Sequence, residues 1–92
     1  MSDDDVTFWQ KHGVDDEKQK FTIEVVKKAF KKYNNYYDVC CFIAKEFKEE
    51  YKNRWTVFGY NKYKGFGYSD YKDTFIGIEY KKQAKITITN HK

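Results

Sequence analysis

The chain contains no leucine, and it has only two cysteines and two histidines among its 92 residues. Phenylalanine, tyrosine and tryptophan make up 21% of it, so aromatic side chains must supply much of the core in place of leucine. A chain of this length can form one small domain with a modest core, but not two. We therefore expect a single folded domain over residues 1–92, with residues 1–5 frayed.

No apolar run approaches the length of a membrane-spanning helix. The first residues read MSDDDV, which is acidic where a secretory signal peptide would be basic and then apolar. These two absences favour a cytoplasmic protein that has no membrane partner.

Cysteine and histidine are too few, and too poorly placed, to indicate chemistry. Cys40 and Cys41 are adjacent on a predicted helix, where their side chains diverge, so we interpret both as reduced thiols with Cys40 nearer the core. No C-x-x-C or His-rich pattern accompanies them. His12 and His91 lie near the two ends, and no serine or cysteine has a plausible base beside it. We therefore expect no metal site, no cofactor and no enzymatic activity.

The formal net charge of +4 arises from lysines that are spread along the whole chain. Such spacing is more typical of a solvated surface than of a nucleic-acid footprint. One stretch keeps the second possibility open, because aromatic residues that could stack on bases alternate there with lysines. The residues are Tyr60, Tyr63, Phe66, Tyr68 and Tyr71, interleaved with Lys62, Lys64 and Lys72. Binding of single-stranded nucleic acid is thus an alternative hypothesis, and it predicts a steep loss of binding with salt.

The stretch from Asp38 to Trp55 contains the clearest helical pattern of the chain. Apolar residues recur at steps of one, three and four, while lysine and glutamate occupy the other side. Asp38 is the expected N-cap, and Asn53 can end the helix. The predicted buried stripe consists of Val39, Cys40, Ile43, Ala44, Phe47 and Tyr51.

A second amphipathic helix is predicted earlier in the chain. Asp15 and Asp16 provide its N-cap and first-turn negative charge, and it is expected to run to about Tyr33. Asn34 and Asn35 tolerate left-handed backbone, so they can close this helix and turn the chain into the next as a helical hairpin. The predicted buried stripe consists of Thr22, Val25, Val26, Ala29, Phe30 and Tyr33.

Strands are predicted at both ends of the chain. Val6 to Gln10 can form a short strand that ends before a turn at Gly13, and alternation from Trp55 onward predicts another. Two further strands close the sequence, at 75–80 and 84–89. The fold class is therefore α+β, with a two-helix hairpin packed on an antiparallel β-sheet.

The sequence of the final hairpin predicts how its two strands pair. With Lys81-Lys82-Gln83 as the loop, every cross-strand pair matches in kind: Tyr80 with Ala84, Glu79 with Lys85, Ile78 with Ile86, and Ile76 with Ile88. A loop one residue shorter would send the apolar sets of the two strands to opposite faces. The isoleucine face must meet the helices, and the other face carries Phe75, Gly77, Glu79, Lys85, Thr87 and Thr89.

Several short motifs follow one another in a consistent order. They are Ala29-Phe30-Lys31-Lys32-Tyr33-Asn34, Asp38-Val39, Ile43-Ala44-Lys45-Glu46-Phe47 with Tyr51 and Trp55 after it, and Phe75-Ile76. These motifs resemble those of the dynein light chains of the small, peptide-binding, homodimeric type (type 1), which read A-L-x-K-Y-N, D-I, I-K-K-E-F-x-x-x-Y, T-W and F-I. The predicted order of elements, a strand followed by two helices and then further strands, also resembles that family. The resemblance implies a divergent member with a dynein-light-chain-like domain over most of the chain.

The function implied by the resemblance is the capture of short linear peptides by β-strand addition. A typical client would be a segment of a dynein intermediate chain, which implies a role in the dynein motor complex, microtubule-based transport and the cytoskeleton. The peptide-binding residues implied by the resemblance are Gly65, Phe66, Gly67, Tyr68, Ser69, Phe75 and Gly77, with Tyr36 and Tyr37 at the start of the second helix. A structural or interaction protein that acts outside dynein is an alternative.

The chain departs from the family at the residues that should choose the client. The family segment N-F-G-S-Y-V-T-H-E-T corresponds to 64–72 here, with either Gly65 or Phe66-Gly67 as the aligned glycine. The family's Glu-Lys pair is replaced by Tyr36-Tyr37. The apolar groove face of the family maps onto Gly77, Glu79, Lys85 and Thr87, and is therefore more polar. We expect an altered client and a weak or altered homodimer, with Phe58, Phe66 and Tyr68 as candidates for self-association.

Overall fold

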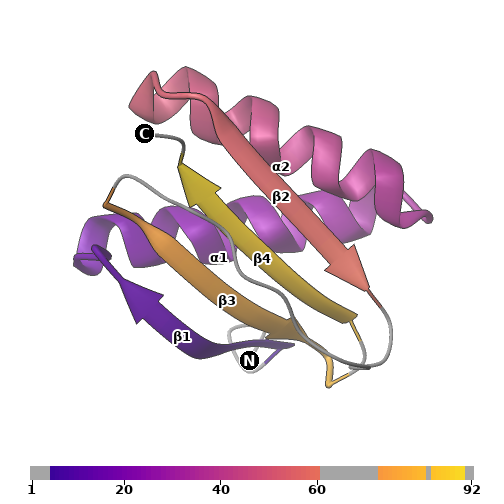
Figure 1. Cartoon of the computed structure of the whole chain (residues 1–92). Coiled ribbons are helices and arrows are strands. Elements are labelled where there is room, and N and C mark those ends of the chain that lie inside the picture. Colours follow the sequence, from indigo (N-terminus) through magenta and orange to yellow (C-terminus); the bar gives the residue numbers. More distant parts are fainter. Residues whose placement is uncertain (1–4, 61–72, 83, 91–92) are drawn as a thin grey trace.

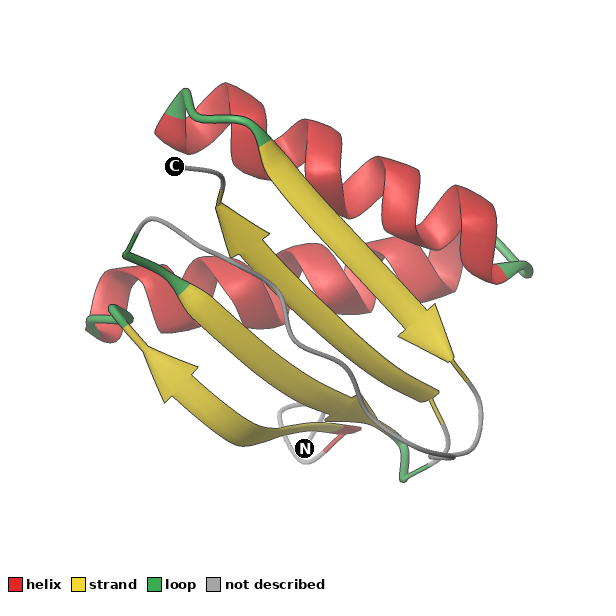
Figure 2. Ribbon diagram, viewed as in Figure 1, coloured by secondary structure: helices red, strands yellow, loops and turns green. Residues whose placement is uncertain are grey.

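The computed structural model describes residues 5–60, 73–82 and 84–90. Its four strands form one antiparallel sheet in the order β1-β3-β4-β2. Both helices cover the same face of this sheet (Figures 1 and 2). The α+β arrangement expected from the sequence is confirmed. The elements are β1 (Val6–His12), α1 (Asp16–Lys32), α2 (Tyr36–Tyr51), β2 (Trp55–Tyr60), β3 (Phe75–Tyr80) and β4 (Ala84–Asn90).

Helix α1 begins and ends as its sequence predicts. The Asp15 carboxylate accepts a hydrogen bond of 2.8 Å from the backbone N–H of Lys18, which satisfies one of the donors left open at a helix start. Acidic residues occupy the first turn and Lys31 and Lys32 the last, so both ends complement the helix dipole. Tyr33 is the C-cap.

The N-cap of α2 lies three residues before the expected Asp38, so that prediction was wrong. Asn35 is the N-cap: its side-chain oxygen accepts a hydrogen bond of 2.9 Å from the Asp38 N–H, and its amide donates to the Asp38 carboxylate at 2.8 Å. Asp38, inside the first turn, therefore binds the Asn35 side chain through both its backbone N–H and its carboxylate. Asn35 has extended backbone, with φ of −133°. At the other end of α2, the C-cap is Lys52 in place of the expected Asn53, and Lys52 has left-handed backbone.

The core lies between the two helices and the sheet face that carries the isoleucines. Its largest fully buried side chains are Phe47, Ile43, Ile76, Ile78, Ile86, Ile88, Val26 and Val39. The predicted helical stripes are confirmed at their centres, whereas their margins are only half-buried. The half-buried members are Phe30, Tyr33, Cys40, Ala44 and Tyr51.

The register predicted for the last hairpin is confirmed. Ile78 lies opposite Ile86, and Glu79 lies opposite Lys85. The connection contains Lys81 and Lys82, whose positive φ values of 54° and 59° turn the chain back. Residue 83 lies outside the described residues.

Strand β1 runs two residues beyond the predicted end, to His12. Its register against β3 shifts between Phe8 and Gln10, so Trp9 is the extra residue of a β-bulge. The bulge was not predicted, because a period-2 sequence pattern carries no mark for an inserted residue.

Adjacent positions of β4 should respond oppositely to substitution. Ile86→Lys places a charge in the fully buried core and should unfold the domain, because the ammonium group has no partner there. Lys85→Ile, on the other face, should leave the urea midpoint nearly unchanged or promote association. Urea denaturation of both variants tests the register, and equal destabilisation would contradict it.

Candidate functional site

The two outer strands of the sheet are β1 and β2, and they differ in how they are protected. Within residues 5–60, 73–82 and 84–90, β2 pairs with β4 alone and β1 with β3 alone. An outer strand offers main-chain groups that a further strand can pair with. Natural proteins usually blunt such an edge with charges or a bulge.

Strand β1 has these protective features, and β2 does not. The bulge at Trp9 breaks the regular edge of β1, and Lys11 adds a charge to it. Strand β2 reads WTVFGY without a charged residue, and its pairing with β4 runs without a shift from Trp55 opposite Asn90 to Tyr60 opposite Lys85. The β2 edge is therefore the better template for an added strand.

Helix α2 fixes the inner face of β2. The Trp55 ring packs on Phe47, with centroids 4.9 Å apart, and on Tyr51 at 6.0 Å. A Cβ at Gly59 would lie only 2.9 Å from the Cys40 sulfur, so helix and strand are in close contact there. On the outer face of β2, 53% of Phe58 is exposed. Strand β2 is thus packed against α2 on its inner face and carries a large exposed apolar side chain on its outer face.

The thiol of Cys40 belongs to this packing. Burial, and secondarily the neighbouring Cys41, raise its pKa to about 11, so Cys40 is a neutral thiol at physiological pH. Cys41 is exposed, and neither cysteine forms a disulfide. The expectation that Cys40 lies nearer the core than Cys41 is confirmed.

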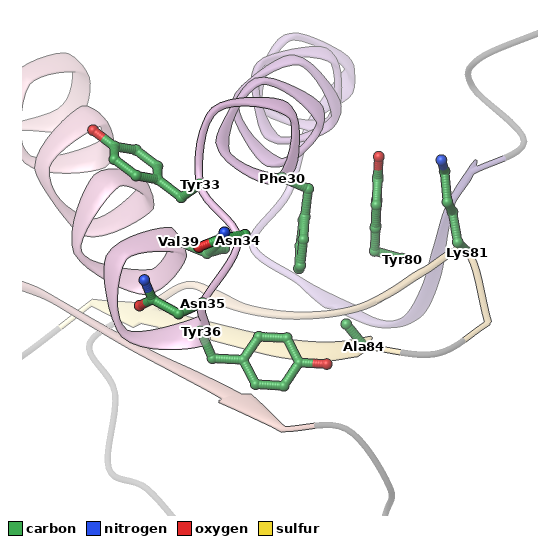
Figure 3. Close-up of a pocket in the computed structure, with 9 residues that line it drawn as sticks. All are labelled: Phe30, Tyr33, Asn34, Asn35, Tyr36, Val39, Tyr80, Lys81 and Ala84. Atoms are coloured by element: carbon green, nitrogen blue, oxygen red, sulfur yellow. The ribbon is translucent and has the colours of Figure 1, made fainter.

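Tyr36 and Tyr37, the implied client-binding pair, occupy different environments. Tyr37 is 77% exposed. Tyr36 lines a pocket of about 540 Å³ between the α1–α2 connection and the β3–β4 turn, where burial raises its pKa. Figure 3 shows the Tyr36 ring reaching toward Ala84, across from Phe30 and Tyr80, whose rings stack at 4.2 Å. Ala84 precedes Lys85, the residue opposite Tyr60, so this pocket lies near the end of β2.

Phe75 and Gly77 lie on β3, which is paired on both sides, so they are not at the β2 edge. Gly77 lies beneath Trp9: a Cβ added there would be 2.6 Å from the indole ring. The Trp9 Nε1–H donates to the Ile78 carbonyl at 3.2 Å, and the indole meets Phe75 edge-on at 6.4 Å. Sequence reasoning missed this covering role of Trp9. The implied residues Gly65, Phe66, Gly67, Tyr68 and Ser69 lie outside the described residues.

A buried polar cluster fixes the start of β3. The Asn90 side chain, 2% exposed, accepts hydrogen bonds from the N–H groups of Asp73 and Thr74 at 3.2 and 3.0 Å, and donates to the Asp73 carboxylate at 2.8 Å. Gly13, with φ of +69°, lies so close to the Asp73 carbonyl that a Cβ would clash with it. Asn90 is also the residue opposite Trp55, so the cluster ties the start of β3 to the start of β2.

The part of the chain that the structure describes holds no group of three histidine, cysteine or acidic residues that could bind a metal ion. No described helix is both long enough and apolar enough to cross a membrane. The candidate site in the described part of the chain is the β2 edge together with the pocket near its end.

Gly77→Ala tests the covering role of Trp9. The new methyl group must displace the indole, so we expect a loss of about 1–3 kcal/mol in the free energy of unfolding, and faster exchange of the Trp9 indole N–H by NMR. In a Trp9→Ala background the same substitution should cost far less, because the clash is gone. An equal cost in both backgrounds would contradict the predicted clash.

Comparison with known proteins adds no identification. The chain matches no protein-family model, and no curated protein sequence is detectably similar to it.

Proposed function

We propose that the protein is a non-catalytic binding module that captures short linear peptides by β-strand addition along β2. The observation that carries the proposal is the β2 edge itself: six residues without charge or bulge, packed against α2, in a sheet whose other edge is bulged and charged. Strand addition draws its affinity from main-chain hydrogen bonds, which a regular edge provides.

Client choice in this proposal depends on side chains beside the edge. Phe58 offers an exposed apolar contact on one face, and the Tyr36 pocket lies near the end of the strand. Backbone pairing tolerates changes in these side chains, whereas specificity does not. Tyr36 and Tyr37 stand where dynein light chains have a Glu-Lys pair, so the proposed client differs from the peptides that dynein light chains bind.

The resemblance to dynein light chains suggests the class of client. We propose a segment of a dynein intermediate chain as the first candidate, with a place in the dynein motor complex and on the cytoskeleton. The strand and helix order of the chain is compatible with this role. A dynein-independent interaction protein would use the same edge with another peptide.

The test is hydrogen exchange with a synthetic peptide from the light-chain-binding segment of a dynein intermediate chain. Binding should slow exchange of β2 amides and leave β1 amides unchanged. Phe58→Lys should weaken binding about tenfold or more, because a charged side chain on an edge strand disfavours pairing with an added strand. Thr7→Lys, at an exposed position of β1, is the matched control and should bind as the unmodified protein does.

Protection of β1 instead of β2 would contradict the proposed edge. A steep fall of binding with salt would also contradict it, since main-chain pairing depends only weakly on ionic strength. Single-stranded DNA added in the same assay tests the alternative, whose residues at 61–72 lie outside the described part of the chain.

Self-association is expected to be weaker than in the homodimeric light chains. Glu79 and Lys85 lie opposite each other and half-buried on the sheet face away from the helices. A dimer that buried this face would have to desolvate both charges in each subunit. Sedimentation over a concentration series should show dissociation at micromolar protein, and Glu79→Thr with Lys85→Thr should tighten the dimer. A dimer that persists at nanomolar protein would refute this expectation.

A further inference from the structure

Four of the chain's lysines lie close together on the outward face of α1. A shallow hollow of about 540 Å³ on this helix is lined by Glu24, Lys27, Lys28, Lys31 and Lys32. Lys28, Lys31 and Lys32 are exposed, and Lys27 is half-buried. Four lysines against one glutamate within a little over two helical turns make this a strongly basic surface.

The arrangement costs helix stability. Lys27 and Lys31, and likewise Lys28 and Lys32, are four residues apart, and like charges at this spacing repel. The negative end of the helix dipole stabilises the charges of Lys31 and Lys32 in the last turn. This stabilisation is much weaker one turn earlier, at Lys27 and Lys28. Glu24 lies three residues before Lys27 and four before Lys28, so this single carboxylate is a helical neighbour of both lysines. A bound anion would reduce the repulsion among the lysines of this face.

One of these lysines is already held in place. The Lys32 ammonium lies 5.5 Å from the Tyr33 ring centroid and 5.7 Å from that of Phe42. Cation–π contacts of this kind restrict the side chain before any partner arrives, which lowers the entropy lost on binding.

We infer that the outward face of α1 binds an extended acidic segment of a partner protein. Lysines four residues apart are separated by about 6 Å along the helix axis. Alternate side chains of an extended peptide are about 7 Å apart, so acidic residues at every second position can follow one row of lysines. This surface is on the helical layer and is separate from the β2 edge, so the inference does not depend on the proposed peptide capture.

The same observations favour a peptide over nucleic acid or a membrane. None of the five side chains that line the hollow is aromatic, and the Tyr33 and Phe42 rings beside Lys32 already contact its ammonium group, so they are not free for a base to stack on. The phenylalanines of α1 turn inward: Phe21 packs on Phe47 at 5.1 Å and Phe30 on Tyr80 at 4.2 Å. The lining also offers no apolar side chain for insertion into a bilayer. Glu24 can accept a hydrogen bond from a peptide N–H, whereas a phosphodiester has no donor to match it.

The experiment is fluorescence anisotropy with a labelled peptide of about ten residues in which glutamate alternates with glycine. The full chain should bind it, and the same peptide with glutamine in place of glutamate should not bind. Raising the salt from about 0.05 M to about 0.2 M should weaken binding roughly tenfold. Lys28→Gln with Lys32→Gln should weaken it to a similar extent.

The matched control is Lys45→Gln with Lys48→Gln, at two exposed positions of α2. It removes the same charge and should bind within about twofold of the unmodified chain. Equal losses in the two double variants would show attraction by net charge alone and overturn the inference. Tighter binding of single-stranded DNA, or of vesicles with anionic lipid, at the same site would overturn the choice of a peptide.

Discussion

The pairing of four isoleucines at the centre of β3 and β4 is the constraint on which the rest of the structure depends. Ile76 with Ile88, and Ile78 with Ile86, place one apolar surface on a single face of the sheet, and all four are fully buried. Because side chains alternate along a strand, the same pairing sends Glu79 and Lys85 to the opposite face. Both helices cover the isoleucines, and the pairing of β1 with β3 and of β2 with β4 makes β1 and β2 the outer strands.

The two outer strands of the sheet differ in whether a further strand can pair with them. The Trp9 bulge interrupts β1, and the displaced indole covers Gly77, donates to the Ile78 carbonyl and packs on Phe75. One inserted residue thereby breaks the edge and covers part of the outer sheet face. Strand β2 instead packs on α2, through the close contact of Gly59 with Cys40 and of the Trp55 ring with Phe47. It carries no charged residue at its edge.

The helical layer adds a surface of a different physical kind. Main-chain pairing at β2 would depend little on salt, whereas attraction to the lysines of α1 is screened by it. The sheet and the helices present these surfaces from different layers of the domain, so one partner chain could engage either or both. Linking two weak contacts in one partner raises its effective affinity when the connecting segment can span them.

Local patterns in the sequence determined the elements, the α+β class and the hairpin register, because period and cross-strand matching depend on neighbours within a few residues or one turn. The same patterns misplaced the α2 N-cap, since Asp38 and Asn35 are both good capping residues and only the reciprocal bonds between them distinguish their roles. Tertiary structure alone decided that β2 is an edge and that Trp9 covers Gly77. These depend on contacts between residues up to about seventy positions apart, as in the Trp9–Ile78 hydrogen bond, and no local pattern records them.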